Sequence, residues 1–235
     1  MSETQPQQPQ TEQPSTGDGF TIWAVFERGA GIAEGGTPLA DVIAELEAEG
    51  VVTRGIYDVS GMRADADVLV WMHGAAGTDT KPEALQAAVR RVRRSRELAG
   101  TMQVWGAMGV HRDAEFNKRH VPGFLRGLEP KQWVTVYPFN RSYDWYLLPA
   151  DERSRMLAEH GRAGAAYPGI IANTVSAFAL GDYEWILPLE ADDLTDLVDM
   201  MRDLRAVDAR MHVREEIPFF TGRRIGADEI EEVLA

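Results

Sequence analysis

The sequence predicts an α+β fold made of two ferredoxin-like βαββαβ repeats. Three observations indicate this fold. Short runs rich in Val, Ile and aromatic residues alternate with amphipathic segments in the order strand, helix, strand, strand, helix, strand; the same order returns in the second half; and a polar, irregular segment separates the halves. Such a pair suggests one duplicated domain whose sheets pack together or join into a barrel. Two unrelated α+β domains remain the alternative.

The first repeat is expected to span 19–111. In chain order we expect a strand at 20–27, a helix at 37–50, strands at 51–60 and 66–74, a helix at 79–100 and a strand at 101–110. The first helix has apolar residues at helical spacing, with Thr37 as a candidate cap, Pro38 in its first turn and Gly50 at its end. The run ADVLVWMHG is dense in Val, Leu and Trp, which is typical of a buried central strand.

The second repeat is expected to span 132–235. In chain order we expect a strand at 132–139, a helix at 148–164, strands at 173–180 and 182–190, a helix at 192–210 and a strand at 211–220. The third and fourth of these elements are expected to pair around Gly181 and Asp182. The connecting segment at 112–131 is polar and irregular, and a segment of this length inside a compact domain is usually functional.

Composition excludes several classes of function. The formal net charge of −13 argues against sequence-independent nucleic-acid binding, which needs a field of Lys and Arg. The chain has no cysteine, so it can hold neither a disulfide nor a thiolate-ligated metal. Residues 1–18 are polar and expected to be a disordered tail, without the basic start and apolar run of a secretion signal. With no stretch of about 18 apolar residues, a cytoplasmic protein without membrane contact is expected.

His160 lies in the predicted helix ERSRMLAEHGRAG. Arg153, Met156, Leu157, His160 and Gly164 share one helical face. A neutral imidazole on such a face can ligate haem iron, and nearby glycines leave room for a flat ligand. On spacing alone, a histidine beside Met and Leu is more often a hydrogen-bonded core residue than an iron ligand.

More specific motifs surround this histidine. The stretch VTVYPFNRSYDWYLLPADERSRMLAEHGRAG, followed by GDYEW, resembles the coproheme decarboxylases of the chlorite dismutase-like superfamily, in particular the actinobacterial type that converts iron coproporphyrin to haem b. The resemblance covers roughly residues 20–235. It implies a dimeric α+β barrel of two ferredoxin-like repeats, usually assembled as a homopentamer, with the porphyrin in the second repeat.

The resemblance also implies roles for individual residues. His160 resembles the proximal iron ligand, Tyr137 resembles the family's radical tyrosine, and His120 resembles the distal base of the actinobacterial branch. Arg141, four residues after Tyr137, is placed to hold a propionate, because its fork of donors suits a carboxylate. Without the resemblance, Tyr137 would be a strand tyrosine with a surface hydroxyl and Arg141 an exposed loop charge, whereas His120 would fit a solvated loop histidine and a distal base about equally.

Two tryptophans are further candidates. Aromatic residues at their positions line the pocket in the family, so Trp185 is expected to touch a propionate or vinyl edge, and Trp145 to exchange an electron with Tyr137. Both also fit ordinary core positions. His73 and His212 lie in strand patterns and are interpreted as structural. Further propionate-binding candidates near the end of the chain, without a firm motif, are Arg214, Thr221 and Arg223.

The implied substrate is iron coproporphyrin III (coproheme), which is also the cofactor, and the implied product is haem b. Hydrogen peroxide would be the oxidant, and two propionates would become vinyl groups. The basic run at 90–96 is typical of a solvated helix surface, and transient docking of a ferrochelatase is the alternative. A non-catalytic haem carrier or sensor would need His160 but not Tyr137 or His120. Chlorite degradation would need an arginine over the iron, and the segment IIANTV offers none.

Overall fold

The computed structural model describes residues 19–75, 77–112 and 121–235. The predicted disordered tail and His120 lie outside these residues. In the described part of the chain, no helix is both long and apolar enough to cross a membrane.

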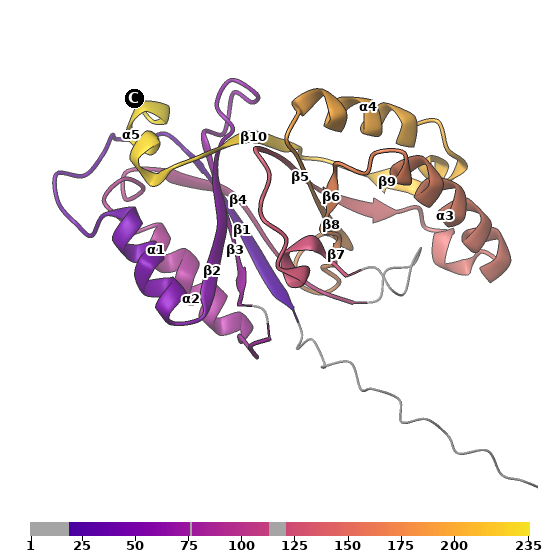
Figure 1. Cartoon of the computed structure of the whole chain (residues 1–235), viewed down its shortest axis with the longest axis horizontal. Helices are drawn as coiled ribbons and strands as arrows, with labels where there is room; N and C mark the ends of the chain where they lie inside the picture. Colours follow the sequence, from indigo (N-terminus) through magenta and orange to yellow (C-terminus); the bar gives the residue numbers. More distant parts are fainter. Residues whose placement is uncertain (1–18, 76, 113–120) are drawn as a thin grey trace, which may run out of the picture.

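The first half forms a four-stranded antiparallel sheet covered by two helices (Figure 1). Its elements are β1 (Phe20–Glu27), α1 (Leu39–Ala48), β2 (Val51–Asp58), β3 (Val68–Gly74), α2 (Pro82–Val92) and β4 (Met102–Val110). Leu39, Leu46, Leu85 and Val92 of the helices pack with alternate strand residues such as Val70 in one hydrophobic core. The predicted order of elements is confirmed for this half.

The second half places its two longer helices, α3 and α4, at the opposite end of the molecule, whereas its short last helix, α5, lies beside the first half (Figure 1). Its strands and α-helices are β5 (Trp133–Arg141), α3 (Ala150–Ala165), β6 (Ile171–Ala172), β7 (Val175–Ser176), β8 (Trp185–Ala191), α4 (Leu194–Leu204), β9 (Val213–Glu215), β10 (Phe220–Ile225) and α5 (Ile230–Val233). Short 3-10 helices are η1 (Gly123–Arg126), η2 (Trp145–Leu147), η3 (Asp208–His212) and η4 (Ala227–Glu229).

The two halves join into one barrel. β2 pairs with β10, and β4 pairs with β7 through Val110 and Ser176. Together with the pairings of β10 with β5, β5 with β8, and β8 with β7, these contacts close a circuit of eight strands. Trp23, Trp71 and Phe124 lie in the cluster enclosed by these strands. The predicted fold class, a barrel of two ferredoxin-like repeats, is therefore confirmed.

A buried polar network ties three parts of the barrel together. Arg54 on β2 donates to Glu190 on β8 (Nε to Oε1, 2.9 Å) and to the carbonyl oxygen of Leu128 in the connecting segment (2.8 Å). Asn173 donates to the same Glu190 oxygen and accepts from the backbone N–H of Phe124. The side chains of Arg54 and Glu190 are 4% and 0% exposed, so each needs the other's charge.

The predicted helix at 79–100 is too long, because α2 ends at Val92. Residues beyond Val92 form turns whose polar groups make hydrogen bonds at the start of α1. The backbone N–H of Arg96 donates to the carbonyl oxygen of Thr37, and Glu97 accepts from the backbone N–H of Leu39. Local periodicity carried no sign of this contact.

Three other predicted elements in the second half are also wrong in extent. The predicted strand at 211–220 is interrupted: β9 ends at Glu215 and the strand that joins the barrel is β10, with Pro218, which has no N–H to donate, in between. The helix predicted at 192–210 ends at Leu204 and is followed by η3. The strand predicted at 173–180 is reduced to β7, although it pairs with β8 as expected.

Candidate functional site

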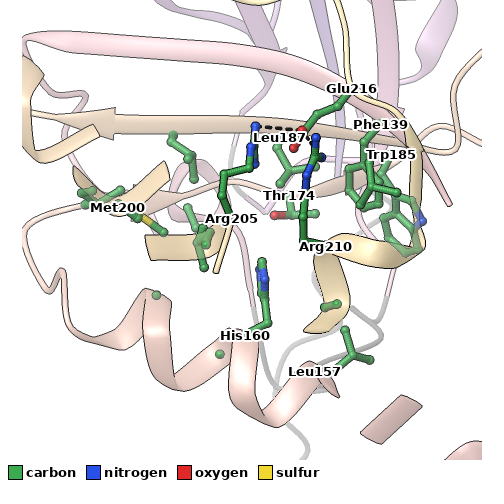
Figure 2. Close-up of a pocket in the computed structure, with 18 of the residues that line it drawn as sticks. Phe139, Leu157, His160, Thr174, Trp185, Leu187, Met200, Arg205, Arg210 and Glu216 are labelled. Atoms are coloured by element: carbon green, nitrogen blue, oxygen red, sulfur yellow. Dashed lines mark hydrogen bonds and ion pairs between the residues drawn. The ribbon is translucent and has the colours of Figure 1, made fainter. Parts of the chain in front are cut away.

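A cavity of about 590 Å³ lies between the second half of the sheet and its helices. One wall is the face of β5 and β8 that points away from the barrel interior, and the opposite wall is α3, with α4 and η3 at the side (Figure 2). This volume is within the range of small-molecule and cofactor sites.

Strand alternation determines which side chains line the sheet wall. Every second residue of a strand points to the same face, so Tyr137, Phe139 and Arg141 of β5 all reach the cavity. The register pairs Tyr137 with Leu187 and Phe139 with Trp185, so these β8 residues line the cavity as well.

His160 projects from α3 into the cavity (Figure 2). Burial, helped by the positive charge of Arg141, lowers the pKa of His160 to about 4. The imidazole is therefore neutral at pH 7, which is the form that ligates a metal. Gly161 beside it also lines the cavity, and a side chain there would meet nothing within 4 Å, so the space next to the imidazole is open.

Tyr137 is buried on the opposite wall. Its ring stacks on Phe219 with centroids 4.3 Å apart and planes at 14°, and its hydroxyl contacts Met201 Sδ at 3.5 Å. Burial, reinforced by the negative charge of Glu216, raises the pKa of Tyr137. The phenol keeps its proton at neutral pH, so it can lose a hydrogen atom rather than act as a phenolate.

Arg141 is positioned by two aromatic rings. Its guanidinium lies 4.1 Å from the ring centroid of Trp145 and 5.0 Å from that of Phe139. Trp145 is fully buried and packs with Met156 and Leu157, so it supports Arg141 from behind and is not among the lining residues. Such contacts restrict the orientation of the guanidinium fork.

The cavity is positively charged although the chain is strongly acidic. Among the described residues that line it, four are arginines (Arg141, Arg162, Arg205 and Arg210) and one is a carboxylate, Glu216. Glu216 Oε2 lies 2.8 Å from Arg205 Nη2 and 2.5 Å from Arg210 Nη1 (Figure 2). The surplus of cations favours a ligand with several negative charges.

The structure therefore brings together four of the six residues proposed from the sequence: Tyr137, Arg141, His160 and Trp185 all line one cavity. Trp145 lies one layer behind, and His120 falls outside the described residues. The roles assigned to all six stay predictions.

The weaker propionate candidates do not line the cavity. Arg214 lies over the exposed ring of Tyr143, Thr221 bonds to Thr135, and Arg223 pairs with Glu229.

The two histidines interpreted as structural have partners within the fold. His73 contacts the carbonyl oxygen of Gly74 (Nδ1 to O, 2.7 Å) and packs on Phe124, and burial lowers its pKa to about 4. His212 contacts Ser142 and packs on Trp145, although it lies in η3 rather than in a strand.

Sequence reasoning missed Arg205, Arg210 and Glu216. The first two follow the end of α4, where cations are commonly found, and Glu216 lies beyond β9. In the sequence, the only signal for this part of the site was that these arginines lie close to acidic residues. That signal does not distinguish residues of a cavity wall from residues of a solvated turn.

Fold and site together define an α+β-barrel protein with a histidine on one wall of an arginine-rich cavity. The chlorite dismutase family model matches residues 33–225, so the chain belongs to the chlorite dismutase family. The resemblance inferred from the sequence motifs is thereby confirmed.

Curated relatives and solved structures agree with this assignment. A coproheme decarboxylase of Mycolicibacterium smegmatis is 51% identical over 219 residues, which is 90% of this chain and 92% of that protein. A coproheme decarboxylase of Thermus thermophilus is 28% identical over 81% of this chain and 78% of that protein. The structure of chlorite dismutase from Candidatus Nitrospira defluvii in complex with imidazole superposes with a TM-score of 0.74 at 18% identity, covering 94% of this chain and 96% of that chain, which supports the fold.

Proposed function

We propose that this chain is a coproheme decarboxylase that uses hydrogen peroxide to convert two propionates of iron coproporphyrin III into vinyl groups, giving haem b. The observation that carries the proposal is the position of His160 on α3 and Tyr137 on β5, on opposite walls of one arginine-lined cavity. The relative with 51% identity is itself named coproheme decarboxylase.

The cavity fits an iron porphyrin with carboxylate arms. The imidazole of His160 is neutral at physiological pH and stands beside open space at Gly161, so it could ligate the iron of a bound porphyrin. Leu157, Ile170 and Leu187 offer apolar surface for a flat macrocycle. Arg141, with the other arginines of the cavity, would hold the propionates.

The protein's part in the reaction is mainly placement. The bound iron porphyrin supplies the oxidising centre that reacts with peroxide. His160 holds the macrocycle from the α3 side, and His120 is proposed to take a proton from the peroxide. Arg141 and its neighbours would hold a propionate beside Tyr137. Tyr137 would first give up one electron and its phenol proton to the oxidising centre, and the resulting phenoxyl oxygen would take a hydrogen atom from the propionate β-carbon. Trp185 is proposed to contact a propionate or vinyl edge, and Trp145 to exchange an electron with Tyr137.

The organisation of the working enzyme is part of the same proposal. We propose a first repeat at 19–111, a connecting segment at 112–131 and a porphyrin-binding repeat at 132–235, assembled as a cytoplasmic homopentamer. A ferrochelatase would make transient contact. Two arginines of the 90–96 run are already engaged within the chain: Arg91 with Glu45 and Glu49, and Arg96 with Glu97 and Glu231.

Mass spectrometry of the bound porphyrin tests the function directly. The chain is loaded with iron coproporphyrin III and hydrogen peroxide is added. Stepwise loss of two carboxyl groups, ending at haem b, is expected. Binding with no change in porphyrin mass would indicate a carrier or sensor instead, and rapid release of oxygen from chlorite would indicate a chlorite-degrading enzyme.

A further inference from the structure

Glu216 is the one carboxylate among the described residues that line the cavity. A single oxygen, Oε2, pairs with both Arg205 and Arg210, and Figure 2 shows the two arginines converging on it. A carboxylate gripped by two guanidinium groups is also the way in which proteins bind the carboxylate of a ligand. Glu216 therefore occupies a site that could also bind the carboxylate of a ligand.

The arginines of this site are open to a ligand, whereas Glu216 is not. Their side chains are 36% and 37% exposed, while that of Glu216 is 13% exposed. Each guanidinium has five donors, of which Glu216 can engage only a part. A ligand carboxylate in the cavity can thus approach both arginines without any rearrangement of α4 or η3.

Glu216 belongs to a segment whose backbone is not paired in the sheet. It follows β9 and precedes β10, and its backbone lies outside both strands. Phe219, three residues later in the same segment, is the residue stacked on Tyr137. The carboxylate on the arginine pair and the ring that packs on Tyr137 therefore come from the same short segment.

We propose that Glu216 is a resident carboxylate that a propionate of the porphyrin displaces from Arg205 and Arg210. The proposal rests on the proposed function and names the regulation of that same site. In the ligand-free chain Glu216 neutralises one of the two arginines and holds both in place. In the loaded chain the propionate takes over this position, and Glu216 turns away.

Decarboxylation then reverses the exchange. For each propionate, one carboxylate, one hydrogen peroxide and one proton give a vinyl group, carbon dioxide and two waters, so the negative charge of that arm disappears. The arginine pair loses its ligand anion, and Glu216 returns to it. Once Glu216 has returned, the arginine pair no longer binds the edge of the macrocycle that carries the new vinyl group, which favours rotation or release of the macrocycle.

The variant Glu216→Gln distinguishes exchange with a ligand carboxylate from a purely structural role of Glu216, because the two predict opposite changes in the affinity for the porphyrin. The binding of iron-free coproporphyrin III, which has four carboxylates and no iron, is followed by its absorption and fluorescence. Exchange predicts tighter binding by Glu216→Gln, by about tenfold, because the ligand no longer competes with a charged side chain. The tetramethyl ester of the same porphyrin should bind the parent and the variant equally. Glu231→Gln, which removes a carboxylate paired with Arg96 far from the cavity, is the matched control and should behave as the parent.

Weaker or unchanged binding of the tetracarboxylate by Glu216→Gln would overturn the exchange, because it would mean that Glu216 only aligns the arginines. Glu216→Asp gives a second measurement if the glutamine variant is poorly folded: exchange predicts an affinity between those of parent and Glu216→Gln, and an aligning role predicts a loss. Failure of the proposed function has a different signature: the parent chain itself would bind neither porphyrin, or would bind iron coproporphyrin III without any change in its mass after peroxide addition, whatever the affinity of the Glu216 variants.

Discussion

The ring of Tyr137 is stacked on that of Phe219, with centroids 4.3 Å apart and planes at 14°. This contact fixes the plane of the phenol, and the contact of its hydroxyl with Met201 Sδ at 3.5 Å is a weak one. The ring is therefore held by packing, whereas the oxygen is available for chemistry.

Tyr137→Phe should bind iron coproporphyrin as the parent does and form haem b at least about a hundredfold more slowly, since placement remains but the transferable hydrogen atom is gone. Its stability should change by less than about 1 kcal/mol, because only a weak contact is lost. The rate is measured by chromatography of the porphyrin after peroxide addition. Tyr143→Phe, at an 82% exposed tyrosine, is the control. Haem b formation at the parent rate would show that Tyr137 is not the reactive residue.

His160→Ala should lose the shift of the Soret band that axial ligation gives to iron coproporphyrin, and added imidazole should restore it. In the parent, ligation should persist from pH 7 down to at least about pH 5, because the pKa of His160 is lowered to about 4 even in the ligand-free chain and the iron competes further with the proton. A spectral titration measures both. An unchanged spectrum in the alanine variant would mean that another residue ligates the iron.

The same low pKa makes the ligand-free chain less stable in acid. His160 and His73 both have pKa values lowered to about 4 in the folded chain, whereas an unfolded histidine titrates near 6.5. Between these values the unfolded state binds more protons, so the free energy of unfolding falls as the pH drops from about 6.5 to about 4. Urea unfolding at several pH values should show this decline, and His160→Gln should make it shallower. An equal slope in the variant would contradict the assignment.

Arg141→Lys should raise KM for iron coproporphyrin by about tenfold while lowering kcat less, because lysine keeps the charge but loses the planar fork and the stacking on Trp145 and Phe139. Steady-state kinetics with varied coproheme measure the effect. Arg214→Lys alters a similar contact with exposed Tyr143, away from the cavity, and should leave both constants unchanged. Equal constants for Arg141→Lys and the parent would exclude Arg141 from propionate binding.

Glu190→Gln should destabilise the chain by about 3–5 kcal/mol, because it leaves the Arg54 charge buried without its partner. Replacing both residues, by Arg54→Met with Glu190→Leu, should recover much of the loss. Denaturant unfolding measures each variant. Glu229→Gln breaks an exposed pair with Arg223 and should change stability by less than about 1 kcal/mol. A similarly small effect at Glu190 would mean that the network contributes little.

Local patterns in the sequence were enough to predict most strands, the order of elements and one wall of the site. β1 occupies the predicted residues 20–27, and α3 was predicted at 148–164 and observed at Ala150–Ala165. The two-residue period of a strand places Tyr137 and Arg141 on one face, and the helical period places His160 on the inward face of α3. Such periodicity is a property of neighbouring residues, so it is visible without the fold.

Only the tertiary structure decided how distant segments meet. Arg205 and Arg210 meet Glu216 although η3 and β9 separate them in the chain. The turn that follows α2 makes hydrogen bonds to the start of α1. Ile230 and Leu234, near the last residue of the chain, pack into the core of the first half. None of these contacts has a local period. Each depends on long-range packing and on charges brought together by closure of the barrel, and the energy of such contacts is absent from the pattern of any single segment.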